Sequence, residues 1–122
     1  LASPDYDGNG MYRSWGNVRV SSIVGLLFLD FEQPRRLRIN GSASIALDDP
    51  LRETFPGCVF VVRLRAEHIF PNCPRYLHRM QLVEHSAHAP RPDYTPPVPA
   101  WKGYEVFREF LPARDRGEDA PG

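Results

Sequence analysis

Residues 5–17 form the segment whose residue types and spacing most suggest chemistry: Asp-Tyr-Asp-Gly-Asn-Gly-Met-Tyr-Arg-Ser-Trp-Gly-Asn. Glycines flank the asparagine at 8–10, so the backbone there can adopt left-handed or tightly turned conformations. Successive N–H groups in such a turn can point the same way and form a concave site for an anion. Arg13 and Ser14 follow directly and add a cationic fork and a hydroxyl. These residues predict a phosphate-binding loop, and the alternative is an ordinary surface turn followed by a solvated arginine.

Two other sets of residues give weaker chemical signals: the four histidines of the chain, and the arginines within residues 35–38. His68 lies in an apolar alternation, which favours a hydrogen-bonded core residue over a catalytic base. The other three histidines lack the spacing to a carboxylate that a zinc site would need, so we predict no metal site. A solvated strand face accounts for the arginine cluster better than a phosphate patch does.

A short helix and two strands are expected directly after the loop. Residues 12–22 fit a short helix or helical turn. Residues 23–31 are almost all apolar, which predicts a central strand buried on both faces and ended by a turn at 32–34. Residues 36–46 alternate between apolar and polar side chains, which predicts a half-exposed strand. Gly41 in the middle of that strand predicts a bulge or a bend.

The second half of the chain predicts one more long strand and little regular structure after it. Asp49 and Pro50 fit the cap and the first residue of a short helix. Residues 58–70 alternate, which places on one face Phe60, Val62, Leu64, Ala66, His68 and Phe70. A proline-rich extended loop is expected over 87–99. Aromatic residues at helical spacing predict a short helix over 99–111.

Length and composition predict a single domain that spans 1–111, followed by a charged tail at 112–122 that is expected to be disordered. The formal net charge of 0 argues against a nucleic-acid partner. No apolar run is long enough to span a bilayer, so we expect no membrane partner and a cytoplasmic protein. Cys58 and Cys73 are expected as reduced thiols, although the sequence leaves a bridge between them open. The chain begins with Leu1 and no lead-in, so we expect the natural protein to be longer at this end.

The expected fold is mainly β. Several strands, short helical connections and glycine bends predict a small antiparallel barrel. An open sheet edge promotes aggregation, so we expect the barrel to close on itself or to dimerise.

Three motifs in order give the chain a family resemblance. The first is the turn at 5–11 with Arg-Ser-x-Gly-Asn at 13–17. The second is the hairpin formed by residues 24–30 and 35–41, and the third is Ile-Phe-Pro-Asn-Cys-Pro-Arg-Tyr-Leu-His-Arg at 69–79. Through these motifs the chain resembles, over roughly residues 1–80, the pyridoxamine 5'-phosphate oxidase-like family of FMN-binding split barrels.

The resemblance implies an antiparallel, Greek-key-like split β-barrel with short helices, in a homodimer that holds FMN at the subunit interface. Arg13 falls where the family has a basic residue that holds the FMN phosphate, and Asn17 falls where a polar side chain can reach the cofactor. The implied cofactor-binding residues are Asn9, Gly10, Met11, Tyr12, Arg13, Ser14, Asn17, Asn72, Cys73 and Arg75; the last three lie in a segment that looks like the rim of the pocket. The family's first strands have no counterpart here, so the domain is expected to be truncated at its N-terminus.

The implied activity is that of an FMN-dependent oxidoreductase acting on a small-molecule substrate. The alternative is a non-catalytic dimeric module that binds flavin or haem, and a third reading is a truncated domain that serves only for dimerisation. Relatives with this barrel bind FMN, a deazaflavin or haem, so the fold alone leaves the cofactor open. The sequence names neither the substrate nor the electron donor.

Overall fold

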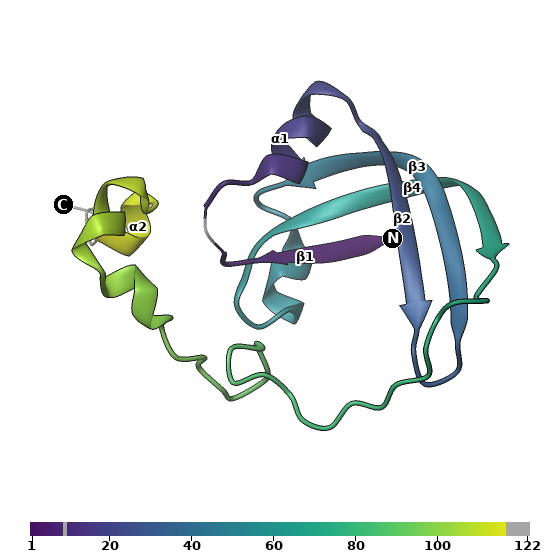
Figure 1. The fold of residues 1–122 in the computed structure, drawn as a ribbon. Coiled ribbons are helices and arrows are strands. Elements are labelled where there is room, and N and C mark those ends of the chain that lie inside the picture. The colour runs from purple at the N-terminus through teal and green to yellow at the C-terminus, as the bar shows by residue number, and fades with distance from the viewer. Residues whose placement is uncertain (9, 117–122) are drawn as a thin grey trace.

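The computed structural model describes residues 1–8 and 10–116, which form one antiparallel sheet of four strands (Figure 1). The strands are β1 (Ala2–Tyr6), β2 (Ile23–Asp30), β3 (Arg35–Ala46) and β4 (Cys58–Asn72). They lie in the order β1-β4-β3-β2. The long strands bend along their length, so the sheet curls into half a barrel (Figure 1). The mainly β prediction is confirmed, and the complete split barrel stays a prediction.

Two short helices form where the sequence predicts them. The helix α1 (Arg13–Val20) connects β1 to β2, and the 3-10 helix η1 (Pro50–Thr54) connects β3 to β4. The Asp49 carboxylate accepts the N–H of Leu51 at 3.0 Å, which confirms the predicted cap. The same carboxylate pairs with Arg63 Nε at 2.6 Å, so η1 is attached to the face of β4 that it covers.

The strand β2 does not lie where the sequence analysis expected it. It is an edge strand that pairs with β3, and side chains of both its faces are exposed: Leu27 by 47% and Phe28 by 48%. The expectation of a central strand buried on both faces is therefore wrong. An apolar run of this length has the same pattern in a buried strand and in an edge strand, so periodicity alone does not distinguish them.

The predicted irregularity at Gly41 is confirmed, and it changes which residues of β4 share a face. The pairing of β3 with β4 shifts between Asn40 and Gly41, and it skips Glu67 on β4. A Cβ atom on Gly41 would lie 2.0 Å from the Arg65 carbonyl oxygen, so the strands approach too closely there for a larger residue. Before Glu67, the even-numbered residues of β4 share a face with Phe60; after Glu67, the odd-numbered residues take that face.

His68 is the residue most affected by this reversal. It pairs with Asn40 on β3, so it lies on the face opposite to that of Phe60, and it is exposed. The expectation of a core histidine that shares a face with Phe60 is therefore wrong. Ile69 and Pro71, which pair with Ile39 and Leu37 of β3, take that face instead.

The core lies where α1 packs against one face of the sheet. Val18 of α1 packs with Ala43 of β3 and with Phe60 and Val62 of β4. Burial of each large apolar side chain stabilises the fold by about 1.5–3 kcal/mol. On the opposite face, Val61 of β4 is fully buried, so both sides of the sheet are covered at this end.

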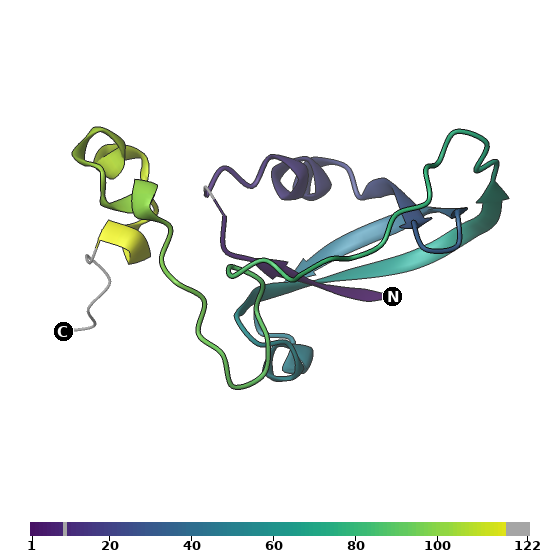
Figure 2. The ribbon, with the colours of Figure 1, turned by 60° about the horizontal axis from the view of Figure 1, so that its bottom comes forward.

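The chain after β4 runs as an extended segment past the sheet and ends in short helices (Figure 2). Two 3-10 helices, η2 (Ala100–Gly103) and η3 (Glu105–Phe110), replace the single helix expected over 99–111. Within the predicted tail 112–122, the helix α2 (Ala113–Arg116) forms one turn, and 117–122 lie outside the described residues. Among the described residues, no helix has both the length and the apolarity needed to cross a bilayer.

Candidate functional site

The loop between β1 and α1 has the left-handed backbone that its glycines predicted. Gly10 has a φ of +74° and Tyr12 a φ of +45°, a conformation that residues with a side chain rarely adopt. Tyr12 caps α1 without a side-chain hydrogen bond, and the first turn of the helix contains no acidic residue. The first N–H groups of a helix lack partners within the helix and carry partial positive charge, which favours an anion at this end.

The predicted phosphate ligands lie at this helix start. Arg13 and Ser14 are the first two residues of α1, and both are exposed. Arg13 forms no ion pair with any described residue, so its guanidinium is free to bind an anion. Asn9 lies outside the described residues.

A small cavity of about 190 Å³ opens in front of the loop, and we call it the polar cavity. It is lined by Asp5, Tyr6, Gly8, Gly10, Tyr12, Arg13, Ser14 and Trp15. The Nε1 of Trp15 donates a hydrogen bond to Oδ1 of Asp5. The other oxygen of Asp5, Oδ2, is buried and has no hydrogen-bond partner among the described residues. The lining of the polar cavity therefore includes a cation and a hydroxyl, those of Arg13 and Ser14.

A larger apolar cavity of about 610 Å³ adjoins it behind the same two aromatic residues. It lies between α1 and the sheet, and its lining is Tyr12, Trp15, Gly16, Val18, Arg19, Ala43, Ser44, Ile45, Leu47 and Phe60. The ring centroids of Tyr12 and Trp15 lie 5.8 Å and 6.3 Å from that of Phe60. Tyr12 and Trp15 line both cavities, and both rings also pack against the core.

The C-terminal helices are attached to the loop by a cluster of ion pairs that the sequence analysis did not predict. Lys102 Nζ donates to Asp7 and, at 2.9 Å, to Asp115. Arg114 donates to Asp7 and, at 3.1 Å, to the hydroxyl of Tyr12. We call this set (Asp7, Tyr12, Lys102, Arg114 and Asp115) the terminal clasp.

Within the terminal clasp, the pKa values of Asp7 and Lys102 are shifted so that each residue keeps its charge. Burial by itself would raise the pKa of Asp7, but hydrogen bonds and charges from Lys102 and Arg114 outweigh it and hold that pKa below its ordinary value. Burial would lower the pKa of Lys102, but its two carboxylate partners raise it. Pro112 lies beside Gly10, where an added Cβ would come within 2.6 Å of its ring. The loop is therefore held from outside by the end of the chain.

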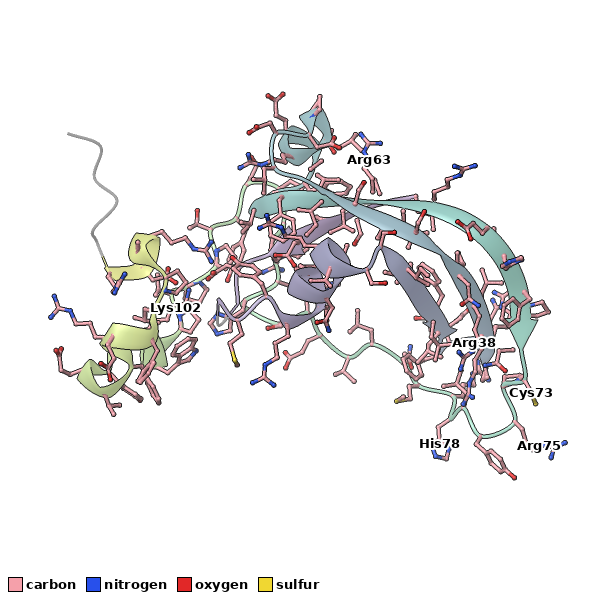
Figure 3. All side chains as sticks on the ribbon, turned by 90° about the horizontal axis from the view of Figure 1, so that it is seen from above. Arg38, Arg63, Cys73, Arg75, His78 and Lys102 are labelled. Atoms are coloured by element: carbon pink, nitrogen blue, oxygen red, sulfur yellow. The ribbon has the colours of Figure 1, made fainter. Side chains whose placement is uncertain are left out.

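The remaining predicted site residues lie in two separate places. Met11 belongs to the loop and Asn17 to α1, and both are exposed. Asn72, Cys73 and Arg75 lie at the opposite end of β4, whose 15 residues correspond to roughly 50 Å of chain. Figure 3 shows Cys73 and Arg75 at the far side of the molecule from Lys102. One chain does not bring the two groups together.

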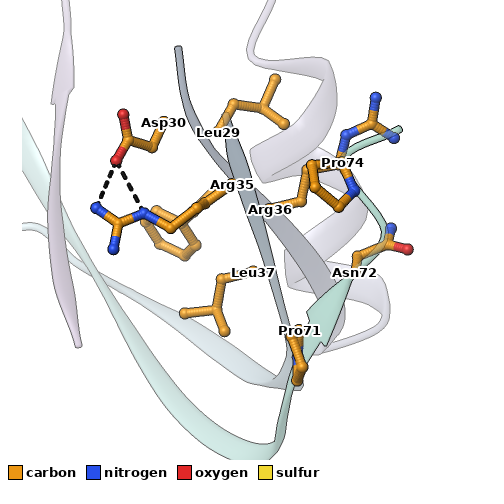
Figure 4. A pocket seen from close by; sticks show the side chains of 9 residues that line it. Leu29, Asp30, Arg35, Arg36, Leu37, Pro71, Asn72 and Pro74 are labelled. Atoms are coloured by element: carbon orange, nitrogen blue, oxygen red, sulfur yellow. Dashed lines mark hydrogen bonds and ion pairs between the residues drawn. The ribbon is translucent and has the colours of Figure 1, made fainter. Parts of the chain in front are cut away.

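The far end of the sheet has a cavity of its own, of about 490 Å³ (Figure 4). Asn72 lines it beside Arg36, whose Nε is buried there without a partner among the described residues. Arg35 also lines it and pairs with Asp30 at 2.9 Å. The lining of this cavity thus combines polar side chains with the apolar Phe28, Leu29, Leu37, Pro71 and Pro74.

In the described part of the chain, the histidine, cysteine and carboxylate side chains form neither a metal-binding group nor a disulfide. No group of three or more histidine, cysteine, aspartate or glutamate side chains there could hold a metal ion. Cys58 and Cys73 are both free thiols.

Comparison of the chain with protein-family models, with curated proteins and with solved structures finds no significant match.

Proposed function

We propose that this chain binds FMN and acts as an FMN-dependent oxidoreductase on a small molecule. The observation that carries the proposal is that the polar cavity and the apolar cavity share Tyr12 and Trp15 as a common wall. A ligand with an anionic end and a flat apolar end has one part suited to the polar cavity and one part suited to the apolar cavity. The sequence resemblance to the pyridoxamine 5'-phosphate oxidase-like family supports FMN as that ligand.

The residues present fit the two ends of FMN. The unpartnered guanidinium of Arg13, the hydroxyl of Ser14 and the free N–H groups at the start of α1 suit a phosphate. The apolar cavity has a volume within the usual range of about 300–1,000 Å³ for small-molecule sites, and it has aromatic walls. Asp7 is an acidic residue of the same loop, and Lys102 and Arg114 neutralise it.

Bound flavin supplies the redox chemistry, and the chain contributes binding, orientation and electrostatics. Arg13 and the helix start would hold the phosphate, while the rings of Tyr12, Trp15 and Phe60 would exclude water from the flat end. These roles are attributed to groups whose positions are described above, and they involve no residue from the far end of β4.

A homodimer is part of this proposal. The strands β1 and β2 are both at the edges of the sheet, and an open edge favours pairing with another chain. Asn72, Cys73 and Arg75 lie too far along β4 to serve the same cofactor as Arg13 within one chain. A second subunit would give them a cofactor to contact.

A non-catalytic flavin-binding module is the second candidate. The lining of the apolar cavity includes no histidine, cysteine or carboxylate, which are the common acids, bases and nucleophiles of enzymes. Oxygen consumption by the flavin-loaded protein with candidate substrates distinguishes an enzyme from a module.

The test of FMN binding is a fluorescence and absorbance titration of the protein with FMN. We expect saturable binding by the wild-type chain and at least tenfold weaker binding by the Arg13→Ala variant, because a charge-assisted phosphate contact is lost. Arg38→Ala is the matched control, because Arg38 is exposed on β3 and removes the same charge away from the loop. Full FMN affinity in Arg13→Ala would contradict the phosphate assignment.

A further inference from the structure

Tyr12 has a backbone conformation that its own side chain disfavours. Its φ of +45° and ψ of 35° lie in the left-handed region that residues with a Cβ rarely adopt. Such a residue keeps this conformation only where the surrounding structure imposes it, and residues of this kind gather at ligand sites. Tyr12 is half-buried and lines both the polar cavity and the apolar cavity. The contacts that hold Tyr12 therefore also set the shape of both cavities.

Tyr12 is held from two directions. From the cavity side, its carbonyl oxygen accepts the N–H of Gly16 at 2.7 Å, and its ring centroid lies 5.8 Å from that of Phe60. From the other side, Arg114 on α2 donates from Nη1 to the Tyr12 hydroxyl at 3.1 Å, across 102 residues of chain. The contact that reaches Tyr12 from outside the cavities thus comes from the C-terminal segment.

Arg114 connects the two ends of the loop. Its Nη2 donates to Asp7, which precedes the glycines, while Nη1 donates to Tyr12, which follows them. A planar guanidinium with several N–H donors suits such a double contact. Arg114 itself belongs to the lining of neither cavity, so it acts on a ligand there only through Tyr12.

The rest of the segment 111–116 supports the position of Arg114. Lys102 Nζ donates to Asp115, the next residue of α2, at 2.9 Å. Leu111 is buried, and Pro112 lies against Gly10 of the loop, where an added Cβ would come within 2.6 Å of the proline ring. Apolar contacts and ion pairs together hold this segment on the outside of the loop.

We propose that Arg114 is a positioning residue for the candidate ligand site: it holds Tyr12 as the common wall of the two cavities, so docking of the segment 111–116 and ligand binding favour each other. The inference rests on the proposed function, because it takes FMN as the ligand. A wall that is already held in place loses less conformational freedom when the ligand binds. The coupling is reciprocal, so FMN stabilises the docked segment by the same factor by which the docked segment tightens FMN binding.

Two variants remove the two sides of this contact. Arg114→Ala removes the donor, and Tyr12→Phe removes the hydroxyl but keeps the ring. We expect fluorescence titration to show FMN binding about tenfold weaker in each, a typical size for coupling between sites. The double variant should bind no more weakly than either single variant, because both changes remove the same contact. Arg108→Ala is the matched control, because it removes the same charge from an exposed ion pair of η3.

A second measurement uses the wild-type chain. Its reporter is hydrogen–deuterium exchange over residues 111–116, where the Asp115 N–H donates to the Pro112 carbonyl at 2.9 Å. We expect saturating FMN to slow this exchange about tenfold in the wild type and to leave it nearly unchanged in Tyr12→Phe. A merely structural role of Arg114 would lower the stability of the fold without this response to FMN.

The outcomes separate the inference from the proposed function. Unchanged FMN affinity in Arg114→Ala, or exchange over 111–116 that FMN does not alter in the wild type, overturns the role of Arg114 and leaves the proposed function standing. Failure of the wild-type chain to bind FMN overturns both.

Discussion

Asp7 illustrates how single residues set the charge of the candidate phosphate loop. Its carboxylate lies next to the loop, and it would weaken anion binding if it were free. Lys102 and Arg114 pair with it, so its negative charge is neutralised. The same pairing makes the stability of the terminal clasp depend on pH.

The Asp7→Asn variant tests this dependence. A carboxylate whose pKa is lowered in the folded state stabilises the protein above its unfolded pKa of about 3.8, and that stabilisation is lost as pH falls through the folded pKa. Asp7 is 44% exposed, so we expect a loss of about 0.5–1 kcal/mol at pH 7. Urea unfolding should show that the difference in unfolding free energy between wild type and variant disappears below about pH 3.8. If this difference in unfolding free energy stayed constant down to about pH 2, the stability would not depend on the ionisation of Asp7.

The raised pKa of Lys102 determines at which high pH the stabilisation is lost. A lysine whose folded pKa exceeds 10.5 contributes its stabilisation below that pH, and the contribution is lost as pH rises through the folded value. The pair of Asp7 with Lys102 is therefore charged on both sides between pH 3.8 and pH 10.5.

The close approach of β3 to β4 depends on the absence of a side chain at Gly41. A Cβ on Gly41 would lie 2.0 Å from a backbone oxygen, which cannot move without shifting the strand. We expect Gly41→Ala to cost about 2–3 kcal/mol of unfolding free energy, measured by urea denaturation. Gly16→Ala is the matched control, because nothing lies within 4 Å of its added Cβ and the position is helical. That variant should gain up to about 1 kcal/mol. Equal effects of the two variants would contradict the close approach at Gly41.

The strands show which parts of the fold a sequence can predict. Alternation identified β3 and β4, because a period of two persists wherever one face of a strand is buried. The edge position of β2 was not predictable, because its neighbours are decided by the rest of the sheet. The glycine at 41 signalled the irregularity, but the skipped residue is Glu67 on the partner strand. The prediction of the face on which His68 lies was therefore wrong.

The candidate site likewise has parts that the sequence predicts and parts that it does not. The left-handed loop and the position of Arg13 follow from adjacent residues, so the sequence predicted them. The unpaired oxygen of Asp5 depends on where Trp15 packs, ten residues along the chain. The contacts of Lys102 and Arg114 with Asp7 span 95 and 107 residues, and no local pattern indicates them.

For the molecule as a whole, the terminal clasp decides whether the C-terminal helices stay beside the loop between β1 and α1. The side chain of Lys102 is only 6% exposed, although it carries a charge. We expect Lys102→Ala to speed hydrogen–deuterium exchange over residues 100–116 and to leave the amides of β3 and β4 protected. Arg108→Ala is the matched control, because its ion pair with Glu105 is exposed. Unchanged exchange over 100–116 in Lys102→Ala would show that apolar contacts alone hold this segment.

The span of the terminal clasp also has a consequence for the order of folding. The β2–β3 hairpin closes over a short turn, whereas the contact between Asp7 and Arg114 closes a loop of 107 residues. In an unfolded chain, closing a loop of that length costs roughly 4 kcal/mol of entropy, and the cost falls once the intervening sheet has formed. The clasp therefore forms after the sheet. Because the clasp holds Asp7 and Tyr12 on either side of the loop, the loop geometry that we propose for anion binding is completed only after the segment with Lys102 and Arg114 has docked.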